Sequence, residues 1–110
     1  MSKKCFKQTI KVIQTRAKPL QIEIQIGPVS SCKDKKYFGA IFQNPGNDGS
    51  IVDHSKEIKN LHNKGAISIV ATDLLALTLI KSPADLGADI SVGSSQRFGV
   101  PMGFGGPHAA

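Results

Sequence analysis

AISIVATDLLALTLIKSPADLGADISV, residues 66–92, is the stretch that decides the fold. It opens on a nearly continuous apolar run, residues 66–71, which is typical of a strand covered on both faces of a parallel sheet. Residues 74–80 predict a short helix, and residues 88–92 predict a further strand. Strands alternating with helices indicate an α/β fold with a mostly parallel sheet and flanking helices.

The sequence before this stretch continues the alternation. Residues 8–17, QTIKVIQTRA, carry apolar side chains at helical spacing and predict a helix. Residues 20–26, LQIEIQI, alternate strictly and predict a strand with one buried face. Residues 38–42 predict another short strand. Residues 53–63 predict a helix that begins with an aspartate cap, and Gly65 is expected to end it in the left-handed conformation.

Length and composition restrict the class of protein. A chain of 110 residues forms one domain at most, and 40% apolar with 20% charged residues argues against wholesale disorder. No apolar run approaches the roughly 20 residues of a membrane helix, and the polar N-terminus does not resemble a secretory signal peptide. Cys5 and Cys32 do not make a disulfide framework, so we expect a reducing compartment.

The net charge of +6 is concentrated near the N-terminus. Residues 1–36 hold nine lysines and arginines against Glu23 and Asp34. Such asymmetry can mark a nucleic-acid or anionic-surface patch. We favour an ordinary solvated lysine-rich face, because the lysines are scattered and no nucleic-acid-binding motif accompanies them.

Asp73 is the first candidate functional residue. It directly follows the buried strand of residues 66–71, and the carboxyl ends of parallel strands are where open α/β folds bind ligands. An aspartate in that place can equally serve as the N-cap of residues 74–80. Spacing alone does not separate the two readings.

Two polar, glycine-rich segments follow the last predicted strand. Residues 93–97, GSSQR, offer hydroxyl, amide and guanidinium groups that could hold an anion, although an ordinary polar turn has the same composition. They match neither the P-loop nor the hydrolase nucleophile elbow. Residues 103–108, GFGGPH, lack the spacing of a dinucleotide loop and read as a flexible loop. We expect no regular element after Gly93.

The histidines and cysteines do not predict a metal centre. His54 and His62 are eight residues apart, unlike the helical pair of a zinc site, and neither cysteine supplies a recognised spacing. No Ser-His-Asp or Cys-His grouping can be argued from the sequence.

VATDLLALTL, residues 70–79, and GADISVGSSQRFGVPMGFGGPHAA, residues 87–110, resemble the pyridoxal-phosphate-dependent glycine decarboxylases, the P-proteins of the glycine cleavage system. A weaker resemblance extends upstream. CFKQTIKVIQTRAKPLQIEI, residues 5–24, is similar to a C-H-P-Q-T segment of that family and the elements after it. The segment from Phe42 to Ala66 is similar to the strand, turn and helix before the central strand. The resemblance therefore covers essentially the whole chain.

The resemblance implies the type I pyridoxal-phosphate fold, as in aspartate aminotransferase. Residues 1–110 would form a single partial α/β domain, a fragment of the large, cofactor-binding domain. Asp73 stands at the position of the aspartate that pairs with the pyridine nitrogen, which makes the ring a better electron sink. The cofactor-facing positions also include Ser94, Ser95 and Gln96, and the adjoining loop would bring His108 near as a polar contact.

Two departures from the family pattern bear on activity. Phe6 and Lys7 stand where the family has histidine and proline, and that histidine is expected to stack over the cofactor ring. Phe6 can stack but cannot exchange a proton. The family's Schiff-base lysine lies in a downstream K-A-T-S-N motif that this chain lacks, so no lysine here takes that role by resemblance and no catalytic residue is predicted.

The resulting hypothesis is a fragment of glycine dehydrogenase (decarboxylating), inactive in isolation. The complete enzyme would decarboxylate glycine on pyridoxal phosphate and pass the aminomethyl group to the lipoyl arm of H-protein. Its partners would be lipoylated H-protein and either another copy or the remainder of the enzyme, in bacterial cytoplasm or mitochondrial matrix, without nucleic acid or membrane. The alternative is a stand-alone, non-catalytic α/β module that acts through oligomerisation or partner binding. A basic nucleic-acid binder is a third reading.

Overall fold

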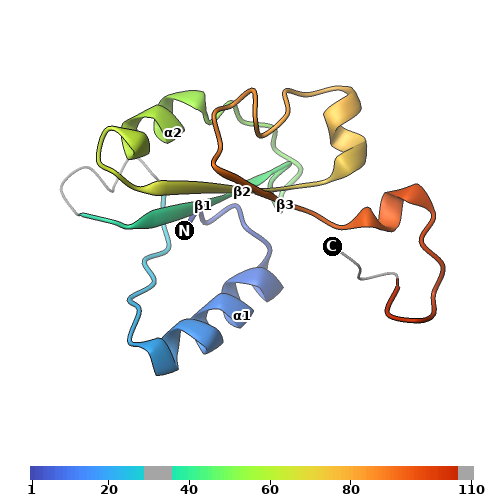
Figure 1. Ribbon diagram of the computed structural model, residues 1–110, viewed down its shortest axis with the longest axis horizontal. Coiled ribbons are helices and arrows are strands. Elements are labelled where there is room, and N and C mark those ends of the chain that lie inside the picture. Colours follow the sequence, from blue (N-terminus) through green and yellow to red (C-terminus); the bar gives the residue numbers. More distant parts are fainter. Residues whose placement is uncertain (29–35, 107–110) are drawn as a thin grey trace.

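The computed structural model describes residues 1–28 and 36–106 (Figure 1). Apart from residues 20–26, its helices and strands follow the alternating order that the sequence predicts. The elements are α1 (Lys7–Ala17), η1 (Lys18–Leu20), β1 (Gly39–Asn44), α2 (Ser55–His62), β2 (Ile67–Thr72), η3 (Leu74–Thr78), β3 (Ile90–Val92) and η4 (Ser95–Phe98), where η is a 3₁₀ helix. No helix in the described part of the chain is long and apolar enough to cross a membrane.

The strands form a parallel sheet in the order β1-β2-β3 within the described residues. β2 lies in the middle, with Val70 opposite Phe42 of β1 and Ile69 opposite Ile90 of β3. The predicted central strand, the strand near residue 40 and the strand near residue 90 are all confirmed. The α/β class with a parallel sheet and flanking helices is therefore confirmed as well.

The core lies between the sheet and α2. Phe42 and Val70 are fully buried, and they pack with Ile58 and Leu61 of α2 and with Leu86. The helix begins at Ser55 with His54 as its N-cap, not the predicted Asp53, although Asp53 Oδ1 accepts a hydrogen bond from the Ser55 N–H at 2.9 Å. It ends at His62, and Gly65 has the expected left-handed φ of 69°.

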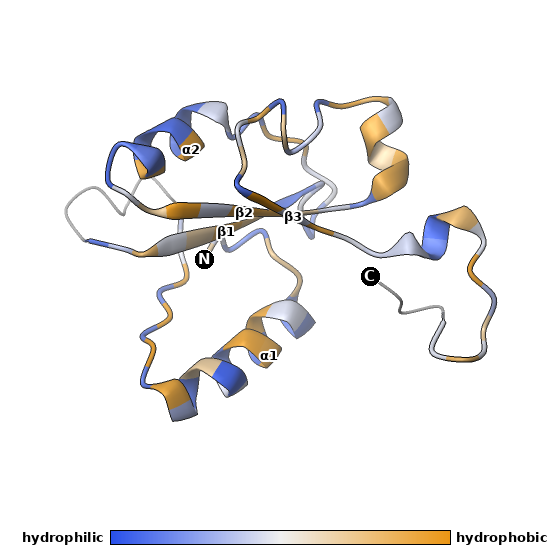
Figure 2. Cartoon of the chain, viewed as in Figure 1, coloured by the Kyte–Doolittle hydropathy of each residue, from blue (hydrophilic) through white to orange (hydrophobic). Residues whose placement is uncertain are grey.

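The opposite face of the sheet is covered less. Because side chains alternate along a strand, Ile69 shares this face with Ile67, Ile90 and Val92. These last three remain 49%, 44% and 47% exposed. α1 lies on this side, set off from the sheet (Figures 1 and 2), and only its last residue, Ala17, is buried. The expectation of cover on both faces thus holds for the α2 face only.

The predicted strand at residues 20–26 is wrong. α1 itself is confirmed and ends before Pro19, but the chain then makes a 3₁₀ turn, and Gln21 takes a left-handed φ of 55°. The following residues run without a neighbouring strand until Gly27, which forms an isolated bridge with Ser2. The alternating sequence pattern does reflect burial, since isoleucines such as Ile24 are half-buried. It does not supply the partner strand that a ladder needs.

The N-terminal residues fix where α1 begins. Ser2 N–H donates to the Ile41 carbonyl of β1 at 2.9 Å, and Asn47 N–H donates to the Lys4 carbonyl at 2.8 Å. Cys5 is fully buried. Asn47 belongs to the turn after β1, which contains a cis Asn44–Pro45 peptide bond. These contacts bring the first turn of α1 to the carboxyl end of β1.

Candidate functional site

A cleft of about 1030 Å³ lies at the carboxyl ends of the strands. One wall consists of strand ends and the segments that follow β2 and β3, and the other is the beginning of α1. Open α/β sheets bind ligands at this edge. The polar and aromatic side chains on its walls are those of Phe6, Gln8, Thr9, Gln43, Thr72, Asp73, Ser94, Gln96 and Arg97.

Asp73 caps a helix, which confirms the N-cap reading of the sequence, and its side chain also lines the cleft, where the ligand-binding reading stays a prediction. Its Oδ1 accepts a hydrogen bond from the Leu75 N–H at 3.0 Å, which caps η3. Its Oδ2 accepts a hydrogen bond from Arg97 Nε at 2.9 Å, and the two side chains form an ion pair. A local cap and a contact across the sheet edge therefore fix the orientation of this carboxylate.

Arg97 is the functional candidate whose role the sequence did not indicate. It lies in η4, whereas no regular element was predicted after Gly93, and the Ser94 hydroxyl caps this short helix by accepting from the Gln96 N–H at 3.2 Å. The Arg97 side chain is 59% exposed, so its pair with Asp73 contributes about 0–1 kcal/mol to stability at most. Its main effect is to orient and neutralise Asp73.

The other predicted cofactor-facing residues divide into three groups. Ser94 and Gln96 line the cleft beside Asp73. Ser95 is not among the residues that line it. His108 lies outside the described residues.

A close backbone approach brings these residues to Asp73. At Gly93 an added Cβ would lie 2.6 Å from the Thr72 carbonyl oxygen, a distance that only glycine avoids. The end of β3 can therefore run directly beside the end of β2. This contact positions the Ser94–Arg97 segment over the edge of the sheet.

The facing wall carries Phe6, at the position where the resemblance expects a histidine. Phe6 is 46% exposed and lines the cleft. Gln43, at the end of β1, completes the floor and is only 6% exposed. No lysine lines the cleft in the described part of the chain. Covalent attachment of a carbonyl ligand by these walls is therefore not supported.

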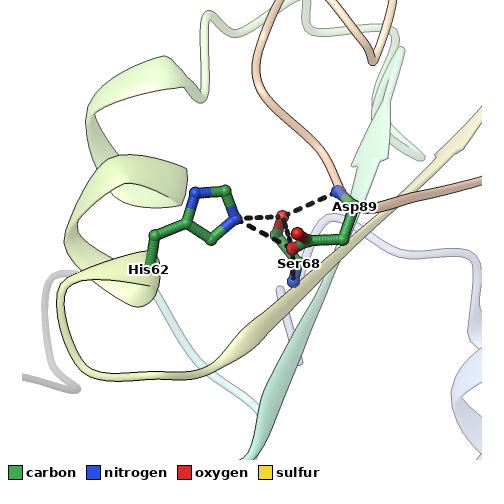
Figure 3. Close-up of polar contacts among 3 residues, drawn as sticks. All are labelled: His62, Ser68 and Asp89. Carbon is green, nitrogen blue, oxygen red and sulfur yellow. Dashed lines mark hydrogen bonds and ion pairs between the residues drawn. The ribbon is translucent and has the colours of Figure 1, made fainter.

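A second polar cluster joins α2 to the sheet, and its members are His62, Ser68 and Asp89 (Figure 3). Asp89 Oδ2 accepts hydrogen bonds from the Ser68 N–H at 2.7 Å and from the Ser68 hydroxyl at 2.8 Å, and His62 Nε2 lies 2.8 Å away. These bonds, the Ser68 backbone bond first, lower the pKa of Asp89 from 3.8 to about 2.

This grouping does not form a catalytic triad. A triad histidine contacts the serine with one ring nitrogen and the aspartate with the other. Here the same Nε2 lies near both Asp89 and Ser68, and the fully buried Ser68 hydroxyl donates to the aspartate. The cluster fastens the end of α2 to β2 and to the start of β3. Within the described residues no group of histidine, cysteine and acidic side chains is arranged to hold a metal ion.

Comparison with known proteins agrees with the resemblance seen in the sequence. The family model described as "Glycine cleavage system P-protein" matches residues 1–110. The glycine dehydrogenase (decarboxylating) of Rhizobium leguminosarum bv. trifolii (strain WSM2304) is 59% identical over 107 residues, and that of Jannaschia sp. (strain CCS1) is 58% identical over 106 residues. Each alignment covers 96% of this chain and 11% of the relative.

A solved structure is similar over nearly the whole chain. It is the crystal structure of glycine decarboxylase (P-protein) of the glycine cleavage system in inhibitor-bound form, with a TM-score of 0.80 and 28% sequence identity. The match covers 97% of this chain and 26% of that chain. The chain thus spans about a tenth of the length of the curated relatives and about a quarter of the solved one.

Proposed function

Because the chain belongs to the glycine cleavage system P-protein family, we propose that it forms part of the cofactor domain of a glycine decarboxylase. The whole protein would decarboxylate glycine on pyridoxal phosphate and transfer the aminomethyl group to the lipoyl arm of H-protein. The observation that carries this proposal is the family match over all 110 residues, with a cleft at the carboxyl edge of the sheet. Bacterial relatives favour the bacterial cytoplasm over the mitochondrial matrix as its location.

The described walls of the cleft fit one side of a phosphorylated aromatic cofactor. Phe6 offers a ring face for stacking, and Ser94 and Gln96 offer neutral hydrogen-bonding groups. Asp73 would accept a hydrogen bond from the ring nitrogen. Each carboxylate oxygen has two lone pairs, so the bonds from Leu75 and Arg97 leave acceptor capacity on Asp73. We also propose Ser95 and His108 as contacts, by resemblance alone.

When bound, pyridoxal phosphate supplies an electron sink for the electrons released as glycine loses carbon dioxide. This chain's residues would hold and orient it. Arg97 keeps Asp73 turned toward the cleft, but its positive charge also competes with a protonated ring nitrogen for the same carboxylate. Phe6 can stack and exclude water but cannot move a proton. We therefore assign binding and orientation to these residues, and no covalent step.

The test is a titration of the 110-residue chain with pyridoxal phosphate, followed by borohydride reduction and peptide mass mapping. We expect saturable binding that Asp73→Asn weakens, without a specific lysine adduct. The matched control is Asp53→Asn, because Asp53 also accepts a hydrogen bond from a basic side chain, Lys81, at 3.0 Å, but lies outside the cleft. A folded chain that does not bind the cofactor, or equal losses in both variants, would contradict the proposal. A single labelled lysine would contradict the non-covalent role.

A second candidate is a non-catalytic α/β module that acts through oligomerisation or partner binding. The pairing of Asp73 with Arg97 favours it, since the carboxylate is already neutralised from within the chain. The half-exposed isoleucine and valine side chains of β3 favour it too. A discrete oligomer in light scattering, with no cofactor binding, would support this candidate over the first.

A further inference from the structure

The first turn of α1 presents unsatisfied hydrogen-bond donors to the cleft. The N–H groups at the start of any α-helix have no intrahelical acceptor. In α1 the N-cap is Phe6, whose side chain cannot accept a hydrogen bond, and the first turn contains no acidic residue. Phe6, Gln8 and Thr9 all line the cleft. The aligned peptide dipoles add about half a positive charge at this end of the helix.

Gln43 lies on the same cleft and lacks a partner. Only 6% of the surface of Gln43 is exposed, so the residue is 94% buried. It lines the cleft from the end of β1. Its carboxamide makes no hydrogen bond to any described residue. The carboxamide atoms are not among the fully buried unsatisfied atoms of the described residues, so they reach the cleft, where water or a ligand can supply the missing hydrogen bonds. Gln43 therefore supplies, independently of α1, a hydrogen-bonding group that is held in a mostly buried position and open only to the cleft.

The charges of the cleft favour an anion of low charge. Asp73 and Arg97 are the only formally charged side chains on its described walls, and they neutralise each other. Lys7, in the first turn of α1, is exposed and does not line the cleft. What remains is a set of neutral donors and a partial positive charge. That set matches a single negative charge better than the double charge of a phosphate.

We propose that the first turn of α1 and the Gln43 carboxamide form a binding site for a small carboxylate. The Gln8 and Thr9 N–H groups donate to one carboxylate oxygen, and the Gln43 amide group donates to the other. The assignment of this carboxylate to an amino-acid substrate such as glycine rests on the proposed function. The binding site itself rests only on the donors and on the unpartnered Gln43.

The test is a titration of the isotopically labelled 110-residue chain with sodium acetate, glycine and inorganic phosphate, followed by two-dimensional amide NMR at constant ionic strength. Acetate and glycine should shift the amide signals of residues 7–9 saturably. Gln43→Met keeps the shape and removes the carboxamide, so it should weaken acetate binding about 10-fold or more. Gln14→Met, the same change on the exposed side of α1, should leave binding unchanged.

A second pair of variants tests the helix end separately. Thr9→Glu places a carboxylate in the first turn, where it competes for the free N–H groups, and it should abolish acetate binding. Thr9→Gln is the uncharged control and should retain it. Failure of acetate to shift residues 7–9, or equal affinity of the Gln43→Met and unaltered chains, would overturn the proposal. Tighter binding of phosphate than of acetate would overturn the choice of a carboxylate.

The two proposals fail in distinguishable ways. Binding of pyridoxal phosphate that depends on Asp73, without acetate binding at α1, would overturn the carboxylate site and leave the proposed function standing. Acetate binding that depends on Gln43, without pyridoxal phosphate binding, would support the carboxylate site and overturn the cofactor role.

Discussion

Replacing His54 with phenylalanine should stabilise the protein, because the His54 ring is buried without hydrogen bonds. The residue precedes α2 and is 6% exposed, and neither Nδ1 nor Nε2 has a partner among the described residues. Its ring centroid lies 4.7 Å from that of Phe42. Phenylalanine keeps this aromatic contact and removes both unsatisfied nitrogens.

The expected gain follows from two opposing contributions. A neutral imidazole has one donor and one acceptor, and each costs about 1–3 kcal/mol when buried without a partner, or about 2–6 kcal/mol together. The larger phenylalanine ring strains a packed site by about 1–3 kcal/mol. The midpoints of these ranges, about 4 and about 2 kcal/mol, give an expected rise of about 2 kcal/mol in the free energy of unfolding at neutral pH.

The His54→Phe variant should also change the pH dependence. Burial lowers the pKa of His54 below its ordinary value of 6.5, against the raising effect of the charges of Glu57 and Asp53. The unfolded chain then binds the proton more readily than the native chain. The contribution of His54 to the free energy of unfolding is therefore present above the unfolded pKa of about 6.5. It falls, by up to about 1.4 kcal/mol per pH unit, as the pH drops toward the lowered native pKa. The variant lacks this loss.

Urea unfolding followed by circular dichroism at pH 7.5 and pH 5 measures both effects. His54→Gln is the control, because it keeps polar atoms in the site but cannot ionise. It should lose the pH dependence without gaining stability at pH 7.5. If His54→Phe is no more stable than the unaltered chain at pH 7.5, or keeps its pH dependence, the argument from unsatisfied nitrogens is refuted.

Three further substitutions test the core, the polar cluster and the edge of the sheet. Val70→Ala, in the fully buried centre of β2, should lower the free energy of unfolding by about 2–3 kcal/mol in urea titrations. The hydrogen bonds from Ser68 lower the pKa of Asp89 from 3.8 to about 2, so ionised Asp89 stabilises the fold above pH 3.8 and this stabilisation is lost as the pH falls through 2. In Asp89→Asn the free energy of unfolding should therefore depend less on pH in that range. Gly93→Ala should lower the thermal midpoint, since its Cβ meets a backbone oxygen at 2.6 Å, whereas Gly103→Ala, with no atom within 4 Å, should not.

The sequence predicted those elements whose signal is local. β2 and α2 were predicted because an apolar run and a helical period each describe one segment. The strand prediction for residues 20–26 was wrong although the residues do alternate. A strand also needs a hydrogen-bonded partner strand from elsewhere in the chain, and the local pattern does not show whether one is present. The prediction that both faces of the sheet are covered was wrong for the same reason, because cover on the second face depends on where α1 lies and not on the sequence of β2.

The candidate site divides in the same way. Asp73 could be placed at the sheet edge because it directly follows a strong strand signal. Its ion pair with Arg97 joins residues 24 positions apart and was missed, although both follow parallel strands whose carboxyl ends meet at one edge. Gln43 and the first turn of α1 could not be foreseen, because their burial and missing partners appear only in three dimensions.

The two walls of the cleft should differ in how readily their backbone opens. β2 and α2 share a packed core, so their amides should exchange with deuterium only in global unfolding. α1 buries only Ala17, so its amides should exchange through local opening at much lower free energy. A ligand bound between the walls would therefore slow exchange mainly in α1. The width of the cleft would then vary with the local motion of α1, while the edge of the sheet stays in place.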